Sequence, residues 1–175
     1  MNSGLEQTKT PNSTAWFMRI LLGARPKWTL VRILLLIIAS VVIFGVILIP
    51  IKVVGRSMEP TLYDGQVRFV NRFAYNWTQP KRGDLIAFKV EERKEIILKR
   101  IIGMPGERIA FHTGVVFING QRLEEPYLPS LGTWEWPEET LGDNTYFVSG
   151  DNRQVSQQFR IQRQQILGKL LRFWN

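Results

Sequence analysis

The chain has 175 residues, enough for one modest domain and an appended segment. Lysine and arginine number 23 against 15 acidic residues, so the formal net charge is +8. A surplus of this kind suits nucleic acid or an anionic lipid surface. The chain has no cysteine, which excludes disulfides, thiolate catalysis and cysteine-bound zinc. The single histidine, His112, excludes a multi-histidine metal site, and we expect no catalytic role for it in its predicted turn.

The positive charge is concentrated near the N-terminus. In residues 1–32 a single acid, Glu6, is outnumbered by basic residues. These are Lys9, Arg19, Arg25, Lys27 and Arg32. Positive charge before an apolar run is typical of a membrane span whose N-terminus stays in the cytoplasm. The remaining sequence contains no nucleic-acid motif, so we expect membrane lipid as a partner and no nucleic acid.

An uncharged apolar run extends from Ile33 to Ile49 and is ended by Pro50. A helix rising ~1.5 Å per residue would extend roughly 26 Å here, close to the ~30 Å of a bilayer core. A buried core helix is disfavoured because the run is apolar all round. A cleaved secretory signal is disfavoured because no small-x-small cleavage site follows.

These patterns predict three parts of the chain and their location. The parts are a cytoplasmic basic N-terminal segment at 1–32, a transmembrane anchor at 33–51 and an exported β-rich catalytic domain at 52–175. The protein would cross the plasma (inner) membrane once, with its N-terminus in the cytoplasm and the folded domain on the outer face.

Beyond Lys52 the pattern changes to short alternating or apolar stretches separated by turn residues. We predict strands at 67–71, 85–90, 95–102, 108–111, 115–118, 145–148 and 166–173. Asp64-Gly65 and Asn119-Gly120 predict tight turns, and 75–81 and 124–144 are expected to be loops. The predicted fold is therefore mostly β, a folded antiparallel sheet or partial barrel preceded by a single transmembrane helix.

Ser57 is a candidate nucleophile because it lies only a few residues beyond the predicted membrane exit. A serine hydroxyl needs a base at neutral pH. Lys99 is the best candidate for this base, because Ile97 and Ile101 would share its face of a strand. Apolar neighbours disfavour the ammonium and lower its pKa. The alternative is a lysine that simply faces solvent.

Both residues lie in a series of five ordered blocks that resembles the type I signal peptidase family. The blocks are SMEPTL at 57–62, RGDLIAF at 82–88, KRIIGMPGE at 99–107, VFING with a following EPY within 116–127, and YFVSGDNR at 146–153. The resemblance implies a membrane-bound serine endopeptidase that removes signal peptides from exported preproteins, without a cofactor or metal. It implies a dyad in which Ser57 is the nucleophile and Lys99 the general base.

The resemblance implies further roles. Gly55 stands where some family members carry a hydroxyl that helps to bind the oxyanion, so main-chain donors or water would have to serve here. Ser156 would help to orient the lysine amine. Shallow apolar pockets for small P1 and P3 side chains would be lined with the help of Met58, Leu62, Ile97 and Leu98. Plain core packing is the alternative for these four.

The last block departs from the family pattern G-D-N-x-x-x-S-x-D-S-R. If Ser156 is the first serine of this pattern, Gln158 replaces the aspartate and Phe159 the second serine. If Ser156 is the second serine, both flanking charges are lost. In either case we expect the Asp–Arg support near the lysine to be incomplete. Asp151 and Asn152 are expected to hold a turn.

Three functions remain open at this point. The first is a general signal peptidase, and the second is a protease of the same superfamily dedicated to one or few substrates, as the altered last block suggests. The third is a non-catalytic, membrane-tethered β domain that binds peptides. The presence of both Ser57 and Lys99 argues against the third.

Overall fold

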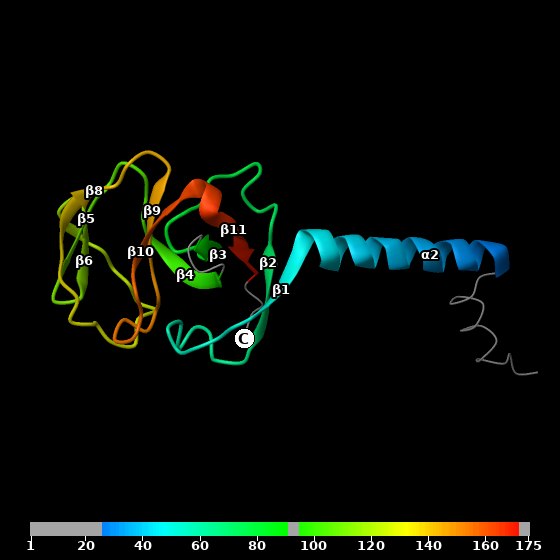
Figure 1. The fold of residues 1–175 in the computed structure, drawn as a ribbon, viewed down its shortest axis with the longest axis horizontal. Helices are drawn as coiled ribbons and strands as arrows, with labels where there is room; N and C mark the ends of the chain where they lie inside the picture. Colours follow the sequence, from blue (N-terminus) through cyan, green and yellow to red (C-terminus); the bar gives the residue numbers. More distant parts are fainter. Residues whose placement is uncertain (1–25, 91–94, 172–175) are drawn as a thin grey trace, which may run out of the picture. The chain divides into compact units, whose positions relative to one another are not determined.

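The computed structural model describes residues 26–90 and 95–171. The chain divides into two compact units between Ile43 and Phe44, so each unit is described by itself (Figure 1). The predicted basic segment at 1–32 is described only from Pro26 onward, and the rest of it lies outside the described residues.

The first unit contains the helix α2 (Pro26–Val42). Proline suits the first helical position because its missing N–H has no partner there in any helix. From Trp28 to Ile47, through the π-helical turn η1 (Ile43–Ile47), the mean hydropathy is 3.0 and none of the segment is buried. It is long and apolar enough to cross a membrane.

The limits of this helix differ from the predicted run. It begins at Pro26 rather than Ile33, and Leu48 and Ile49 belong to a strand, β1 (Leu48–Lys52). This strand pairs with β2 (Val67–Asn71), with Leu48 opposite Asn71. Hydropathy alone does not show where the helical segment ends and β1 begins, because a lipid-facing helix and a half-buried strand are both apolar.

The second unit is built from two antiparallel sheets. The seven-stranded sheet has the order β1, β2, β11 (Ile166–Leu170), β3 (Leu85–Val90), β4 (Glu95–Gly103), β9 (Thr145–Ser149) and β10 (Phe159–Gln162). The four-stranded sheet has the order β7 (Gln121–Arg122), β6 (Val115–Ile118), β5 (Arg108–His112) and β8 (Trp136–Thr140). A 3-10 turn, η2 (Arg163–Gln165), precedes β11. The prediction of a mostly β, antiparallel fold is confirmed.

The seven predicted strands are all present. Three of them have the predicted limits, and the strands at 95, 108 and 145 each extend one residue further. Strand β11 ends at Leu170, and the last residues of the predicted 166–173 lie outside the described part. Asn119 and Gly120 have φ values of 51° and 78°, the left-handed pair that a tight β6–β7 hairpin turn requires.

Strands β1, β7, β8 and β10 were not predicted. The expected loop at 124–144 is wrong over Trp136–Thr140, which pairs with β5 as β8. The sequence does not predict this strand, because it contains Pro137 and two glutamates, and proline and acidic residues are rare in strands. Strand β10 is short and half polar, so its alternation carries little signal.

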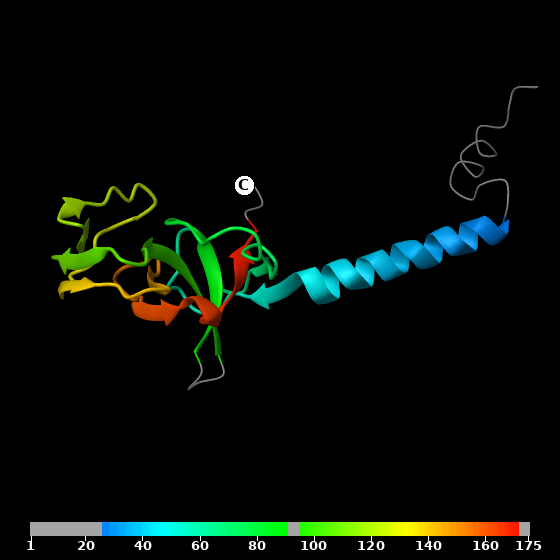
Figure 2. The ribbon, with the colours of Figure 1, turned by 90° about the horizontal axis from the view of Figure 1, so that it is seen from above.

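Three apolar clusters hold the second unit together. Ile86 and Phe88 of β3 enter one cluster, while Leu85 and Ala87 on the opposite face enter a second. The third cluster joins Phe147 of β9 to the smaller sheet. Both faces of β3 are therefore buried over Leu85–Phe88, and these four residues are all apolar. Figures 1 and 2 show the smaller sheet at one end of this unit and β11 toward the other.

Candidate active site

The segment after β1 carries Ser57 and is anchored on both sides. Gly55 has a φ of +85°, a conformation that side chains rarely adopt, and its N–H donates to Asp64 Oδ1 at 2.7 Å. Next to Ser57, Met58 is 2% exposed and packs with Leu62 in the second cluster. The Gly55 amide is thus already bonded, and Gly55 supplies the turn that presents Ser57.

Lys99 lies in the middle of β4 and is directly opposite Ile86 of β3. The lysine is 4% exposed, although its side chain carries an amine. Its Nζ lies 2.7 Å from Ser57 Oγ. The structure therefore brings together the two groups that sequence reasoning paired, across 42 residues of chain.

Burial lowers the pKa of Lys99 to about 8, and the negative charge of Asp151 opposes this shift. The apolar surroundings remove water from the ammonium, which disfavours the charged form. With this pKa, roughly a tenth of the molecules would hold a neutral amine at pH 7, compared with well under a thousandth at the ordinary lysine pKa of ~10.4. The amine is thus suited to accept a proton near neutral pH.

A buried ion pair lies beside the lysine. Arg100 donates through Nε to Asp151 Oδ1 at 2.8 Å and through Nη2 to Oδ2 at 2.6 Å. Thr61 also donates to Oδ2, and the Arg100 guanidinium lies 3.9 Å from the centre of the Tyr127 ring. Asp151 is therefore an ion-pair partner, which the expectation of a simple turn residue missed. Sequence spacing carried no signal for a pair 51 residues apart.

The turn after β9 holds the main chain of Ser57. Asn152 N–H donates to the Ser57 carbonyl at 3.1 Å, and Gly150 N–H donates to Ser156 Oγ at 2.8 Å. The Ser156 hydroxyl donates to the Gln157 carbonyl at 3.0 Å. In the described residues Ser156 thus supports Gly150 and does not bond the amine of Lys99, contrary to the role that we expected.

Among the described residues, two buried donors without a partner lie in the last block, Arg153 in its matching part and Gln158 in its altered part. Within residues 26–90 and 95–171, Arg153 Nη1 and Gln158 Nε2 are buried and have no hydrogen-bond acceptor. Another nitrogen of the same side chain, Arg153 Nη2, forms an ion pair with Glu125 Oε1. Each unpaired buried donor costs about 1–3 kcal/mol. Gln158 stands where one alignment of the block expects an aspartate. The incomplete Asp–Arg support near the lysine stays a prediction, since the Arg100–Asp151 pair beside Lys99 is intact.

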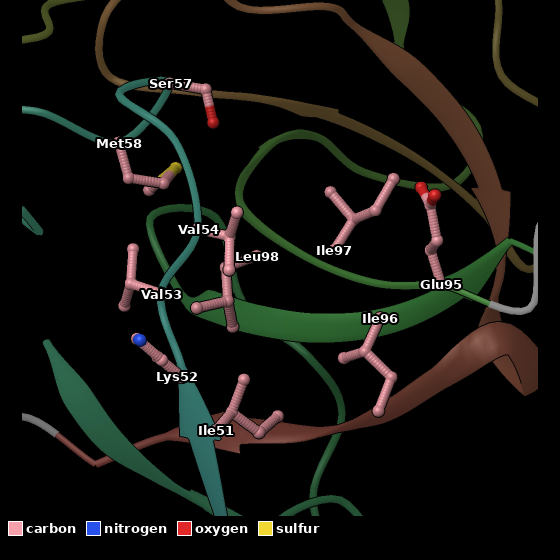
Figure 3. Close-up of a pocket in the computed structure, with 10 residues that line it drawn as sticks. All are labelled: Ile51, Lys52, Val53, Val54, Ser57, Met58, Glu95, Ile96, Ile97 and Leu98. Atoms are coloured by element: carbon pink, nitrogen blue, oxygen red, sulfur yellow. The ribbon is translucent and has the colours of Figure 1, made fainter. Parts of the chain in front are cut away.

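A cleft of about 420 Å³ opens beside Ser57 (Figure 3). It lies between the segment that follows β1 and the first half of β4. Its walls are formed by Ile51, Lys52, Val53, Val54, Ser57, Met58, Glu95, Ile96, Ile97 and Leu98. Three of the four predicted pocket residues, Met58, Ile97 and Leu98, line this cleft. Leu62 does not line it and packs in the second cluster instead.

Sequence reasoning missed the wall formed by Ile51, Val53 and Val54. The signal was present as alternating apolar residues, but Ile51 had been assigned to the membrane anchor. The single histidine, His112, is exposed, with Nδ1 3.6 Å from Glu135 Oε2. In the described parts of the chain no group of three or more His, Asp or Glu side chains is arranged to hold a metal ion.

A family model described as signal peptidase, peptidase S26, matches residues 26–174. The chain belongs to this family. Among its relatives, signal peptidase I of Leptolyngbya laminosa is 36% identical over 133 residues, covering 69% of this chain and 66% of the relative. Signal peptidase IB of Staphylococcus aureus is 31% identical over 163 residues, covering 78% and 85%.

For some relatives, the match covers less than two thirds of the relative's own length. The matches to three of the relatives, from Leptolyngbya, Bacillus subtilis subsp. natto and Synechocystis, span 60–66% of those proteins. A solved structure of signal peptidase I from Enterococcus faecalis is 28% identical, with a TM-score of 0.48 over 54% of this chain and 98% of that one.

Gly150→Ala tests whether the turn after β9 positions Ser57. A Cβ at this position would lie 2.1 Å from the Ser57 carbonyl oxygen, so the main chain of Ser57 must move. A shift of about 1 Å in the position of a reacting group can lower the reaction rate about 100-fold. We expect kcat/KM for peptide hydrolysis to fall by about this factor while the circular dichroism spectrum is retained.

The matched control is Gly142→Ala, whose Cβ would meet Thr145 Oγ1 at an ordinary 3.4 Å. This variant should keep the wild-type rate. Equal rates for Gly150→Ala and wild type would contradict the positioning role of the turn.

Proposed function

We propose that this protein is a membrane-anchored serine endopeptidase that removes signal peptides from exported preproteins. The observation that carries the proposal is the 2.7 Å contact between Lys99 Nζ and Ser57 Oγ in a buried setting. Membership of the S26 family supports it, and so does the apolar span at Trp28–Ile47. The dyad offers the nucleophile and base that peptide-bond hydrolysis requires.

In the proposed mechanism, neutral Lys99 takes the proton from Ser57 Oγ as the oxygen attacks the scissile carbonyl. The developing oxyanion needs fixed donors, for which the Ser57 main-chain N–H is the candidate. Lys99 passes its proton to the leaving nitrogen, and the C–N bond breaks to leave an acyl ester on Ser57. Water then attacks this ester while Lys99 again accepts a proton. The bond between the acyl carbon and Ser57 Oγ breaks, and Lys99 returns the proton to Oγ, which restores the free serine.

The cleft beside Ser57 suits an extended peptide. Strand β1 is an edge of the larger sheet, and the chain that follows it faces the start of β4 across the cleft. In an extended peptide alternate side chains point the same way, so P1 and P3 would both turn toward the cleft wall. Met58, Ile97 and Leu98 are proposed to contact these two side chains, whose small size a shallow apolar wall favours.

Two alternatives remain for the substrate range. The departure of the last block from the family pattern, at Gln158 and Phe159, favours a protease dedicated to few substrates. Cleavage of a panel of unrelated preproteins would indicate a general enzyme, and cleavage of one alone would indicate a dedicated one. Binding of the panel without cleavage would support a non-catalytic peptide-binding domain.

The dyad is tested by preprotein cleavage with the variants Ser57→Ala, Lys99→Ala and Lys99→Arg. We expect each to lower kcat by about a thousandfold or more, as removal of a nucleophile or base does in other serine proteases. Arginine should fail because its guanidinium stays protonated. Lys89→Ala is the control, since Lys89 is an exposed lysine on the adjacent strand β3. Cleavage by Lys99→Ala at the wild-type rate would refute the mechanism.

The proposed orientation places the N-terminus in the cytoplasm and the second unit on the outer face of the plasma membrane. The basic residues before the span support it. Since the chain lacks cysteine, Ser3→Cys and Asp143→Cys give single labelling sites on opposite sides of the span. A membrane-impermeant maleimide should label only the cysteine at position 143 in intact cells. Labelling of position 3 alone would show the reverse orientation.

A further inference from the structure

A second, smaller hollow of about 200 Å³ adjoins the nucleophile. Its walls are formed by Ser57, Ile97, Lys99, Val155, Gln157 and Phe159. The larger cleft of Figure 3 shares Ser57 and Ile97 with this hollow, but Lys99 lines only the smaller one. The two hollows therefore meet at the nucleophile and differ in their access to the base.

Because only the smaller hollow reaches Lys99, the two sides of the scissile bond would bind in different hollows. The base that takes the proton from Ser57 must return it to the leaving nitrogen, which requires that nitrogen to come within about 2.6–3.2 Å of Nζ. The leaving nitrogen belongs to the residue that follows the scissile bond. The acyl side can occupy the larger cleft, but the leaving side has to approach through the hollow that contains Lys99.

We propose that the smaller hollow binds the first side chain after the scissile bond, P1′, and that Gln157, Val155 and Phe159 determine which residues are accepted there. The inference rests on the proposed peptidase function and adds a specificity site to it. It concerns the first residue of the mature product, which the larger cleft does not contact.

The chemistry of the hollow indicates what it accepts. Apart from Lys99, its walls carry no charge: Ile97, Val155 and Phe159 are apolar, and Gln157 offers only its amide. Phe159 is held by an edge contact with Phe88, with 5.6 Å between the ring centres. Val155 is 61% exposed and forms a wall that can be altered without touching the core. The hollow therefore suits a small or medium uncharged side chain.

These walls lie in the segment that departs from the family pattern. Gln157 and Phe159 flank Gln158 in the altered block, so the specificity site would be a property of this chain rather than of the shared dyad. A restricted P1′ residue would also limit the number of preproteins that can be processed. The proposal thus gives a structural cause for the narrower of the two substrate ranges.

The test uses two preproteins that differ only at P1′, Lys in one and Glu in the other, with alanine at P1 and P3. They compete for the same enzyme, and the measured quantity is the ratio of their kcat/KM values. We expect Gln157→Glu to shift this ratio about threefold toward the Lys substrate and Gln157→Lys about threefold toward the Glu substrate, the size typical of exposed ion pairs. Any change in the basicity of Lys99 affects both substrates and cancels in the ratio.

Gln154→Glu and Gln154→Lys are the matched controls. Gln154 is exposed and does not line the hollow, so a charge there should act on P1′ less strongly than a charge at position 157. Opposite shifts at position 157 with little change at 154 would support the site. No shift at 157, or equal shifts at both positions, would overturn it. Failure of the wild type to cleave a matched preprotein with Ala at P1′ would instead refute the peptidase function.

A second variant tests the size of the hollow without using charge. Val155→Trp should narrow it, so the ratio of kcat/KM for a substrate with Tyr at P1′ to one with Ala should fall several-fold. The same ratio in Gln154→Trp should stay at the wild-type value. An unchanged Tyr/Ala ratio in Val155→Trp would contradict the placement of P1′ here.

Discussion

The 2.7 Å contact between the Lys99 amine and the Ser57 hydroxyl joins two segments that reach the site in different ways. Lys99 is placed by the register of β4 against β3, which sets it opposite Ile86 in the interior of a sheet. Ser57 is placed by a short segment whose neighbours are held in the core. A rigid strand and an anchored turn thus fix the distance on which proton transfer depends.

Burial lowers the pKa of the Lys99 amine effectively only if no unpaired negative charge nearby stabilises the ammonium. Asp151 lies close enough to raise the pKa of Lys99, but burial has the larger effect. Arg100 binds both carboxylate oxygens of Asp151, so the carboxylate has a permanent cationic partner. The same pair ties β4 to the turn after β9, which in turn holds the Ser57 carbonyl through Asn152. Electrostatics and positioning therefore depend on one set of contacts.

The sequence predicted the strands that frame the site and the dyad itself, because strand alternation and the five blocks are local signals. Strand β1 was not predicted, since its first residues, Leu48 and Ile49, continue the apolar run and Pro50 is rare in strands. The pairing of Arg100 with Asp151 and the support of Gly150 by Ser156 could not be predicted, because both are tertiary contacts. Leu62, expected to help line a pocket, packs in the core instead, which is the alternative that the sequence left open for it.

The most direct test of this account is the titration of Lys99 itself. In protein labelled with ¹³C-lysine, the Cε signal lost in Lys99→Arg can be assigned to Lys99 and followed by NMR as the pH is raised. We predict a midpoint near the pKa of about 8, with the neutral amine increasing above it. A midpoint near the ordinary lysine value of ~10.4 would contradict the account, because the amine would then stay protonated beside Ser57 at neutral pH.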